Sequence, residues 1–246
     1  MSKRKAEFSP GAAKVAQLLE SRVVADKAPA QQRFFKTGPG EYAEGDIFIG
    51  VSVPDQRKIA KECLPFINLE DIPALLKSPV HEHRLTGLFL LIGRYQKARG
   101  NPDLQEAVVQ MYLDHLDWVN NWDLVDSSAH KILGDWLLDK DRSLLYTLAR
   151  SAHLWRQRVA IIATAAFIPK EDLEDTFRLS EILLNHPHDL IHKAVGWMLR
   201  EAGKVNIDAE KRFLAQYAAR MPRTMLRYAI ERFPEADRKY YLGKGR

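Results

Sequence analysis

The chain has 246 residues, of which 46% are apolar and 28% are charged, and its formal net charge is +5. This composition excludes a globally disordered chain and permits one large domain or two small ones. The mild basic excess fits a polyanionic partner such as nucleic acid, although it does not require one.

The start of the chain, M-S-K-R-K, is basic. No apolar segment follows, so no signal peptide is expected. We expect residues 1–8 to form a flexible basic tail, with a contact to phosphate as the alternative. The longest apolar stretch, residues 88–92, is too short to cross a bilayer, so no membrane association is expected. Cys63 is the single cysteine and cannot form an internal disulfide. The expected location is therefore the cytoplasm, with association to the nucleoid if the protein is bacterial.

The apolar spacing is helical nearly throughout, and no alternating strand pattern is found. Apolar residues recur every three or four positions in four segments, residues 12–20, 85–95, 107–113 and 124–138. Helix-start signals stand at Pro54-Asp55, Asn101-Pro102-Asp103, Pro169 with Glu171 and Asp172, and Pro234-Glu235. One early segment, residues 37–50, is rich in glycine and predicts a loop. These patterns predict an all-α fold.

A basic residue followed by small apolar residues recurs at the start of four predicted helices. These residues are Arg84, Arg158, Lys193 and Arg227. Their separations are 158 − 84 = 74, 193 − 158 = 35 and 227 − 193 = 34 residues, so a further copy is expected near residue 121. A period in the mid-thirties is typical of stacked helix pairs. It predicts a single right-handed solenoid domain of HEAT-like helical repeats over residues 1–246.

Such a solenoid curves, and the periodic basic residues would then lie on one wall of a basic concave groove. Arg84, Arg158, Lys193 and Arg227 are the residues that we expect there, facing a DNA duplex. The alternative for each of them is a snorkelling or helix-terminal charge.

Trp122 and Asp126 are four residues apart and would share one helix face. Asp123 suits the role of an acid that offsets the helix dipole, so Asp126 needs another role, either an ion pair or catalysis. Trp197 has Lys193 four residues before it and Arg200 three residues after it, which favours a strand-facing surface. A tryptophan on an apolar helix face is usually core, and Trp136 is expected to be core.

Other chemistries are poorly represented. The chain has no G-x-S-x-G motif, and the glycine-rich loop lacks the spacing of a phosphate-binding loop. The histidine pairs, His81 with His83 and His186 with His188, lack a carboxylate or cysteine at ligand spacing, so no metal site is expected.

Four segments together resemble the AlkD-type DNA alkylation repair glycosylases, a family built from HEAT-like repeats. They are G50-V-S-V-P-D-Q-R-K58, W122-D-L-V-D126 followed by G134-D135, W155-R-Q-R-V-A-I161 and K193-A-V-G-W-M-L-R-E201. The resemblance spans nearly the whole chain. It implies that the catalytic carboxylate is Asp126 and that the indoles against the damaged nucleotide are Trp122 and Trp197.

The resemblance also implies DNA contacts by Arg158 in the groove and by Arg200. The family usually has a tyrosine near the N-terminus, and this position falls on Phe34. Ring stacking is expected to survive there without the hydroxyl contact.

The implied activity is hydrolysis of the N-glycosidic bond of cationic N3- and N7-alkylated purines in duplex DNA. It leaves an abasic site and needs neither a metal nor a cofactor nor base flipping. A monomer acting on double-stranded DNA is expected. The sequence leaves the lesion open among 3-methyladenine, 7-methylguanine and bulkier adducts. The alternative function is a non-catalytic HEAT-repeat module that binds DNA structures or serves as a protein scaffold.

Overall fold

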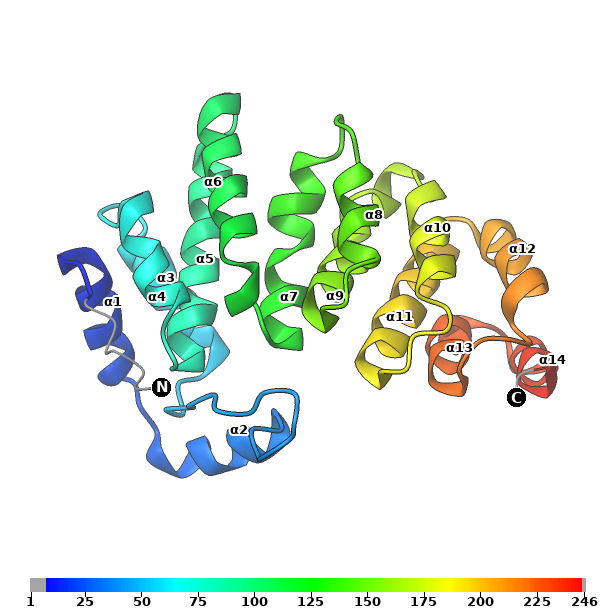
Figure 1. Ribbon diagram of the computed structural model, residues 1–246, viewed down its shortest axis with the longest axis horizontal. Helices are drawn as coiled ribbons and strands as arrows, with labels where there is room; N and C mark the ends of the chain where they lie inside the picture. Colours follow the sequence, from blue (N-terminus) through cyan, green and yellow to red (C-terminus); the bar gives the residue numbers. More distant parts are fainter. Residues whose placement is uncertain (1–7, 245–246) are drawn as a thin grey trace. The chain divides into compact units, whose positions relative to one another are not determined.

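A computed structural model describes residues 8–244, which form fourteen α-helices and no β-strand (Figure 1). The all-α prediction is confirmed. The predicted tail, residues 1–8, lies outside the described residues except for Phe8, whose ring packs edge-on against His83. The chain divides into two compact units, unit 1 over Met1–Ser128 and unit 2 over Ala129–Arg246.

Unit 1 is built around one long helix. Its helices are α1 (Pro10–Glu20), α2 (Ala28–Phe34), α3 (Val53–Cys63), α4 (Ile72–Leu76), α5 (His81–Lys97), α6 (Pro102–Asp114) and α7 (Trp122–Ser128). Helix α5 is buried along most of its length and packs against α3, α4, α6 and α7. The apolar run of residues 88–92 fills the middle of α5, whereas the buried charged residues at its start, Glu82 and Arg84, have hydrogen-bond partners.

Unit 2 has a similar centre. Its helices are α8 (Ser143–Ala149), α9 (Leu154–Ala163), α10 (Glu174–Ile182), α11 (Asp189–Val205), α12 (Ile207–Tyr217), α13 (Arg223–Ala229) and α14 (Glu235–Lys244). Helix α11 packs against α9, α10, α12 and α13. The α11–α13 approach depends on Gly196, because a Cβ there would lie 2.4 Å from the Met225 carbonyl oxygen.

Local sequence signals explain several helix starts. Asn101 caps α6 by accepting a hydrogen bond from the Leu104 amide, and Pro102 follows as the first helical residue. Ser52 caps α3 in the same way. The signal at Pro234 is followed directly by α14.

Two predicted segments differ from the structure. The helix expected over residues 124–138 is not continuous, because α7 ends at Ser128 and a π-helical segment follows over His130–Gly134. Gly134 allows its backbone to approach that of Ala163, since a Cβ would lie 2.3 Å from the Ala163 carbonyl oxygen. The helix start predicted at Pro169 is also wrong. That proline lies in a short 3-10 turn, and α10 begins only at Glu174, after Glu171 with its positive φ of 60°.

Three of the four periodic residues fall at equivalent places in their helices. Arg158, Lys193 and Arg227 are each the fifth residue of their helix, in α9, α11 and α13, whereas Arg84 is the fourth residue of α5. Asp126 is the fifth residue of α7, so this helix carries a carboxylate at that place. The further copy near residue 121 remains a prediction.

In each unit a central helix packs on helices that are near it in sequence, as stacked helical repeats do. The right-handed curvature and the basic concave groove remain predictions. Among the described helices, none combines the length and apolarity that a membrane span requires.

Candidate nucleic-acid site

Helix α7 carries both residues of the predicted catalytic pair. Trp122 is its first residue and Asp126 lies one turn later, so the two side chains share a face of this helix. Both are half-buried. A carboxylate and an indole therefore stand side by side, and each has access to solvent.

The Trp122 ring packs in an aromatic cluster of unit 1. It stacks on Phe35 with a centroid distance of 5.1 Å and an interplanar angle of 14°. Phe34 meets it edge-on at 5.9 Å, and 65% of the Phe34 residue surface is exposed. Phe34 and Trp122, which the sequence analysis assigned to DNA contact, thus lie together at the surface of unit 1.

Asp126 lies close to a buried hydroxyl pair. The Tyr112 hydroxyl, from α6, and the Ser128 hydroxyl share a hydrogen bond of 3.0 Å. Burial raises the pKa of Tyr112, the bond to Ser128 opposes this, and the negative charge of Asp126 raises it further. Tyr112 therefore stays neutral in the electrostatic field of Asp126.

The start of α7 is fixed by an ion-pair network that the sequence did not reveal. His81 places its Nε2 2.8 Å from Asp123 Oδ2 and its Nδ1 3.4 Å from Asp46 Oδ2. Asp46 also accepts a hydrogen bond from Arg84 Nη2 at 2.5 Å. The network links α5, α7 and the loop before α3.

That loop is held by a second buried carboxylate, Glu82, which is 0% exposed. Its Oε1 accepts hydrogen bonds from the amides of Ile49 at 3.0 Å, Gly50 at 2.9 Å and Val51 at 3.3 Å. Gly50 has a φ of +86°, and a Cβ at this position would lie 2.2 Å from the Val24 carbonyl oxygen. The segment G50-V-S-V therefore requires glycine for reasons of space and backbone conformation.

In unit 2, Trp197 is half-buried on α11, and its Nε1 donates a hydrogen bond of 3.1 Å to Glu201 Oε1. Glu201 also accepts from Arg200 and Lys204. Burial disfavours ionisation of Glu201, but the bonds from Lys204 and Arg200 outweigh it and hold the pKa below its usual value. Arg200 forms a second ion pair with Glu231. Trp197 is thus oriented by a carboxylate that two cations keep charged.

The periodic basic residues divide into buried and exposed members. The expectation that Arg84 lines a DNA-binding wall is wrong, because Arg84 is 2% exposed and its guanidinium binds Asp46 and the Ser78 carbonyl. Arg158 is 4% exposed, and it donates a hydrogen bond to the Leu190 carbonyl.

The other two members lie at the surface of unit 2. Lys193 is half-buried and pairs with Asp189 at 2.8 Å, while Arg227 is exposed on α13. DNA contacts by Arg158, Lys193, Arg200 and Arg227 remain predictions.

The tryptophan expected in the core is also at the surface. Trp136 is half-buried, and the Lys140 ammonium lies 4.1 Å from its ring centroid. Trp155, on α9, is 6% exposed and is the buried tryptophan of the described chain. The apolar residues around Trp136 in L133-G-D-W-L-L138 therefore did not correctly predict that this tryptophan lies in the core.

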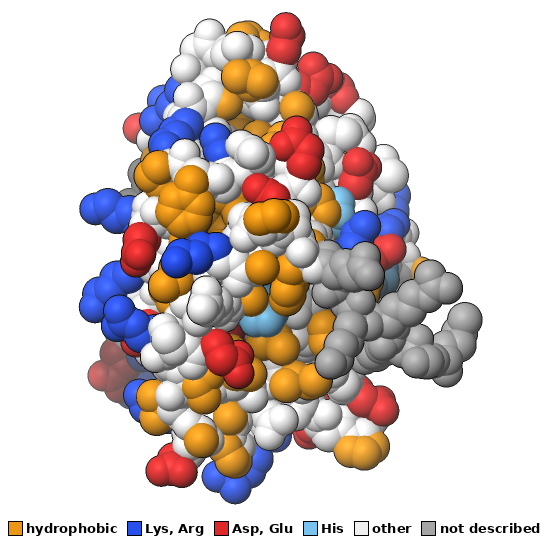
Figure 2. Space-filling model, turned by 90° about the vertical axis from the view of Figure 1, so that its left-hand side faces the viewer, with side chains coloured by type: hydrophobic (Ala, Val, Ile, Leu, Met, Phe, Trp, Pro, Cys, Tyr) orange, Lys and Arg blue, Asp and Glu red, His pale blue; other side chains and the backbone are white. Residues whose placement is uncertain are grey.

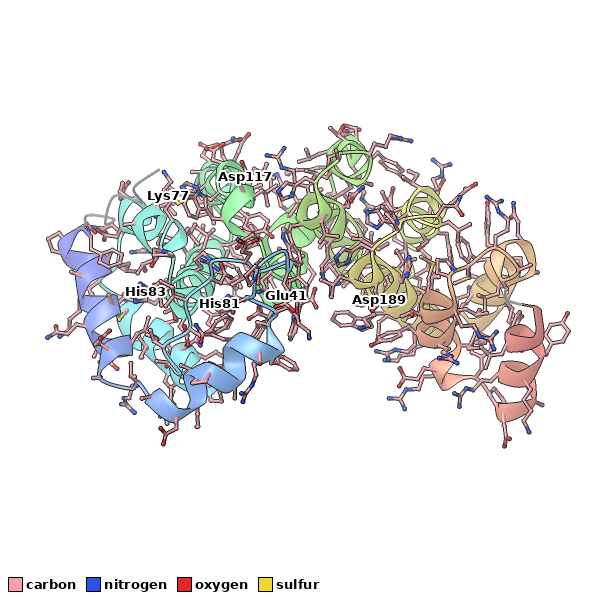
Figure 3. The ribbon with its side chains drawn as sticks, turned by 60° about the horizontal axis from the view of Figure 1, so that its bottom comes forward. Glu41, Lys77, His81, His83, Asp117 and Asp189 are labelled. Atoms are coloured by element: carbon pink, nitrogen blue, oxygen red, sulfur yellow. The ribbon has the colours of Figure 1, made fainter. Side chains whose placement is uncertain are left out.

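The two histidine pairs have other partners. Figure 3 shows His83 on the side of α5 toward α1, where it contacts Phe8, and His81 on the side toward α7. His186 Nε2 lies 2.9 Å from Gln157 Oε1, and His186 Nδ1 accepts a hydrogen bond of 3.0 Å from the His188 amide. Within residues 8–244, no group of three or more histidine, cysteine or acidic side chains could hold a metal ion.

Charges of both signs are interspersed on the face of unit 1 that carries α1 (Figure 2). A phosphate backbone is held by an excess of cations. The basic surface for DNA therefore remains a prediction.

Comparison with known proteins shows the fold and the family of the chain. The structure of a predicted DNA alkylation repair enzyme from Enterococcus faecalis is similar, with a TM-score of 0.68 over 87% of this chain and 98% of that one. The sequence identity is 17%, so this likeness shows a shared fold. No match is found among curated proteins. The family model for DNA alkylation repair enzymes matches residues 15–233, and the chain belongs to this family.

Proposed function

We propose that this repair enzyme is a monofunctional DNA glycosylase that hydrolyses the N-glycosidic bond of N3- or N7-alkylated purines in duplex DNA. The family makes it an enzyme for alkylated DNA. The single observation that supports hydrolysis is the pairing of Asp126 with Trp122, one turn apart and both half-buried on α7.

The chemistry follows from the charge of the substrate. Alkylation at N3 or N7 gives the purine a positive charge, which makes it a good leaving group. The bond between C1′ and the purine nitrogen breaks, and its electron pair moves to the purine and neutralises it. Positive charge builds on the deoxyribose meanwhile, and a fixed carboxylate beside the sugar stabilises this charge.

The two residues have separate roles. Asp126 faces the developing sugar cation and accepts a hydrogen bond from the attacking water, whose oxygen bonds to C1′ while its proton leaves to solvent. The Trp122 ring attracts the same cation through its π face, which contributes about 0.5–2 kcal/mol when water is excluded. Phe34, at 65% exposure, adds a stacking surface next to it.

Unit 2 is proposed to contribute to DNA binding. Trp197 presents an indole, and Lys193, Arg200 and Arg227 offer cations for phosphates, which hold the duplex without reading its sequence. We further propose that the damaged base stays in the duplex during the reaction.

Release of free base from a duplex with radiolabelled methyl groups tests the proposal. The expected products are free 3-methyladenine or 7-methylguanine and abasic sites, without strand cleavage. An unmethylated duplex is the control. Binding to the duplex without base release would instead support a non-catalytic DNA-structure binder, and the absence of both would support a protein scaffold.

A further inference from the structure

A cluster of four aromatic rings lies in unit 1 next to the surface that carries Trp122. Trp122 stacks on Phe35 at 5.1 Å, and Phe35 contacts both Phe48 at 4.9 Å and His81 at 5.2 Å. Phe48 in turn stacks on His81 at 4.4 Å, so Phe35, Phe48 and His81 are in mutual contact. The outer ring of the cluster is a proposed site residue, and the inner ring is an imidazole. A displacement of His81 would therefore be transmitted to Trp122 through packed rings.

The imidazole is also tied to Trp122 along the backbone. His81 Nε2 lies 2.8 Å from Asp123 Oδ2, and Asp123 is the residue after Trp122. The other carboxylate oxygen of Asp123 accepts a hydrogen bond of 2.9 Å from the Leu124 amide in the first turn of α7. His81 thus contacts the proposed site by two routes, one through the aromatic rings and one through the start of α7.

Charged groups surround His81 on several sides. Asp123 faces it from α7, Asp46 from the loop before α3, and Arg84 from the next turn of α5. Burial and the charge of Arg84 favour the neutral ring, but the charge of Asp123 and the hydrogen bonds to Asp123 and Asp46 outweigh them, so the pKa of His81 lies above its usual value. His81 is 2% exposed, so these neighbours, and not solvent, set its protonation.

We infer that His81 is a positioning residue, which acts through Asp123 and the Phe35–Phe48 stack to hold Trp122 and Asp126 in the orientation that base release requires. This inference rests on the proposed function. The imidazolium does not touch the substrate. Its role is to keep the first turn of α7 and the Trp122 ring fixed with respect to α5, because a small misplacement of a catalytic group can cost about 100-fold in rate.

The variant Asp123→Asn tests this inference, because it keeps the shape of the side chain but removes the charge that sustains the imidazolium. The matched control is Asp103→Asn, which makes the same change at an exposed residue in the second position of α6. We expect Asp123→Asn to lower kcat for base release by about 10- to 100-fold at neutral pH, with KM changed by less than about 2-fold. Asp103→Asn should match the wild type.

The pH profile separates positioning from a merely structural role. In the wild type, kcat should fall as pH rises through the pKa of His81, because deprotonation releases Asp123. Loss of the Asp123 charge lowers this pKa, so the same fall should occur at lower pH in Asp123→Asn. An unchanged profile, or a loss of activity that only follows a loss of folded protein, would overturn the inference.

Two measurements on the wild type do not depend on catalysis. An NMR titration of the labelled His81 ring, assigned by its absence in His81→Gln, should show a pKa above the usual value of histidine. The emission of Trp122, obtained by subtracting that of Trp122→Phe, should change over the same pH range. A pKa of His81 at or below the usual value, or an emission that does not follow the titration, would overturn the inference. If the wild type releases no base, the proposed function fails. The two measurements then still test whether the protonation of His81 affects the surroundings of Trp122.

Discussion

Glu210 should make the stability of the protein fall as the pH rises. It lies on α12, is 1% exposed, and its Oε1 has no hydrogen-bond partner among the described residues. Its other carboxylate oxygen is so close to α11 that a Cβ on Gly203 would lie 1.6 Å from it. Burial raises the pKa of Glu210 from 4.5 to about 8.

The sign and size of the effect follow from this pKa. The folded chain keeps a proton on Glu210 between pH 4.5 and about 8, whereas the unfolded chain loses it, so the free energy of unfolding decreases across this range. One pKa unit corresponds to ~1.4 kcal/mol, so the whole range amounts to at most ~5 kcal/mol. Glu210→Gln cannot ionise and removes this dependence.

Chemical denaturation of both proteins at a series of pH values measures the effect. Below pH 4.5 the wild type and Glu210→Gln should have similar stability, and above about pH 8 Glu210→Gln should be more stable than the wild type. The matched control is Glu106→Gln, at an exposed position of α6, which should follow the wild type. Parallel pH curves for the wild type and Glu210→Gln would refute the reasoning.

Three further predictions concern packing and binding. Trp155→Ala should lower the free energy of unfolding by about 3–5 kcal/mol, because it leaves a cavity. Trp122→Ala and Trp197→Ala should melt closer to the wild type but lose base release. Equal melting temperatures for the three variants would contradict this prediction. Arg227→Ala should weaken binding to damaged and undamaged duplex alike and reduce the log–log salt slope by ~0.9, and an unchanged slope would remove Arg227 from the DNA contacts. Gly50→Ala should destabilise the fold by more than ~1–2 kcal/mol, because backbone strain at positive φ adds to the clash of the new Cβ with the Val24 carbonyl oxygen. An unchanged melting temperature would contradict this prediction.

Helices with local start and spacing signals could be predicted from the sequence. The cap at Asn101 and the i, i+4 relation of Trp122 and Asp126 depend only on neighbouring residues, and both are present in the structure. The π-helical segment that ends at Gly134 could not be predicted in this way. Its last residue, Gly134, packs closely on Ala163, which lies far along the chain and leaves no local signal.

Residues whose role depends on distant partners were misread or missed. Arg84 fits the periodic basic set, but its partner Asp46 is 38 residues away, and this pairing places the guanidinium in the interior. His81 was considered only as half of a metal-binding pair, because nothing local points to Asp123, 42 residues later. A periodic pattern indicates where a residue lies on its helix, and the partner packed against it decides whether it is exposed.

Asp126→Asn tests the proposed hydrolysis most directly. The substitution is nearly isosteric, so circular dichroism should show a folded protein, and duplex affinity should stay similar. The single-turnover rate of base release from methylated duplex should fall by about 100- to 1000-fold, as when one stabilising group is removed from a developing charge. Asp103→Asn, with its exposed carboxylate, should keep the wild-type rate. A wild-type rate of base release in Asp126→Asn would contradict the catalytic role of Asp126.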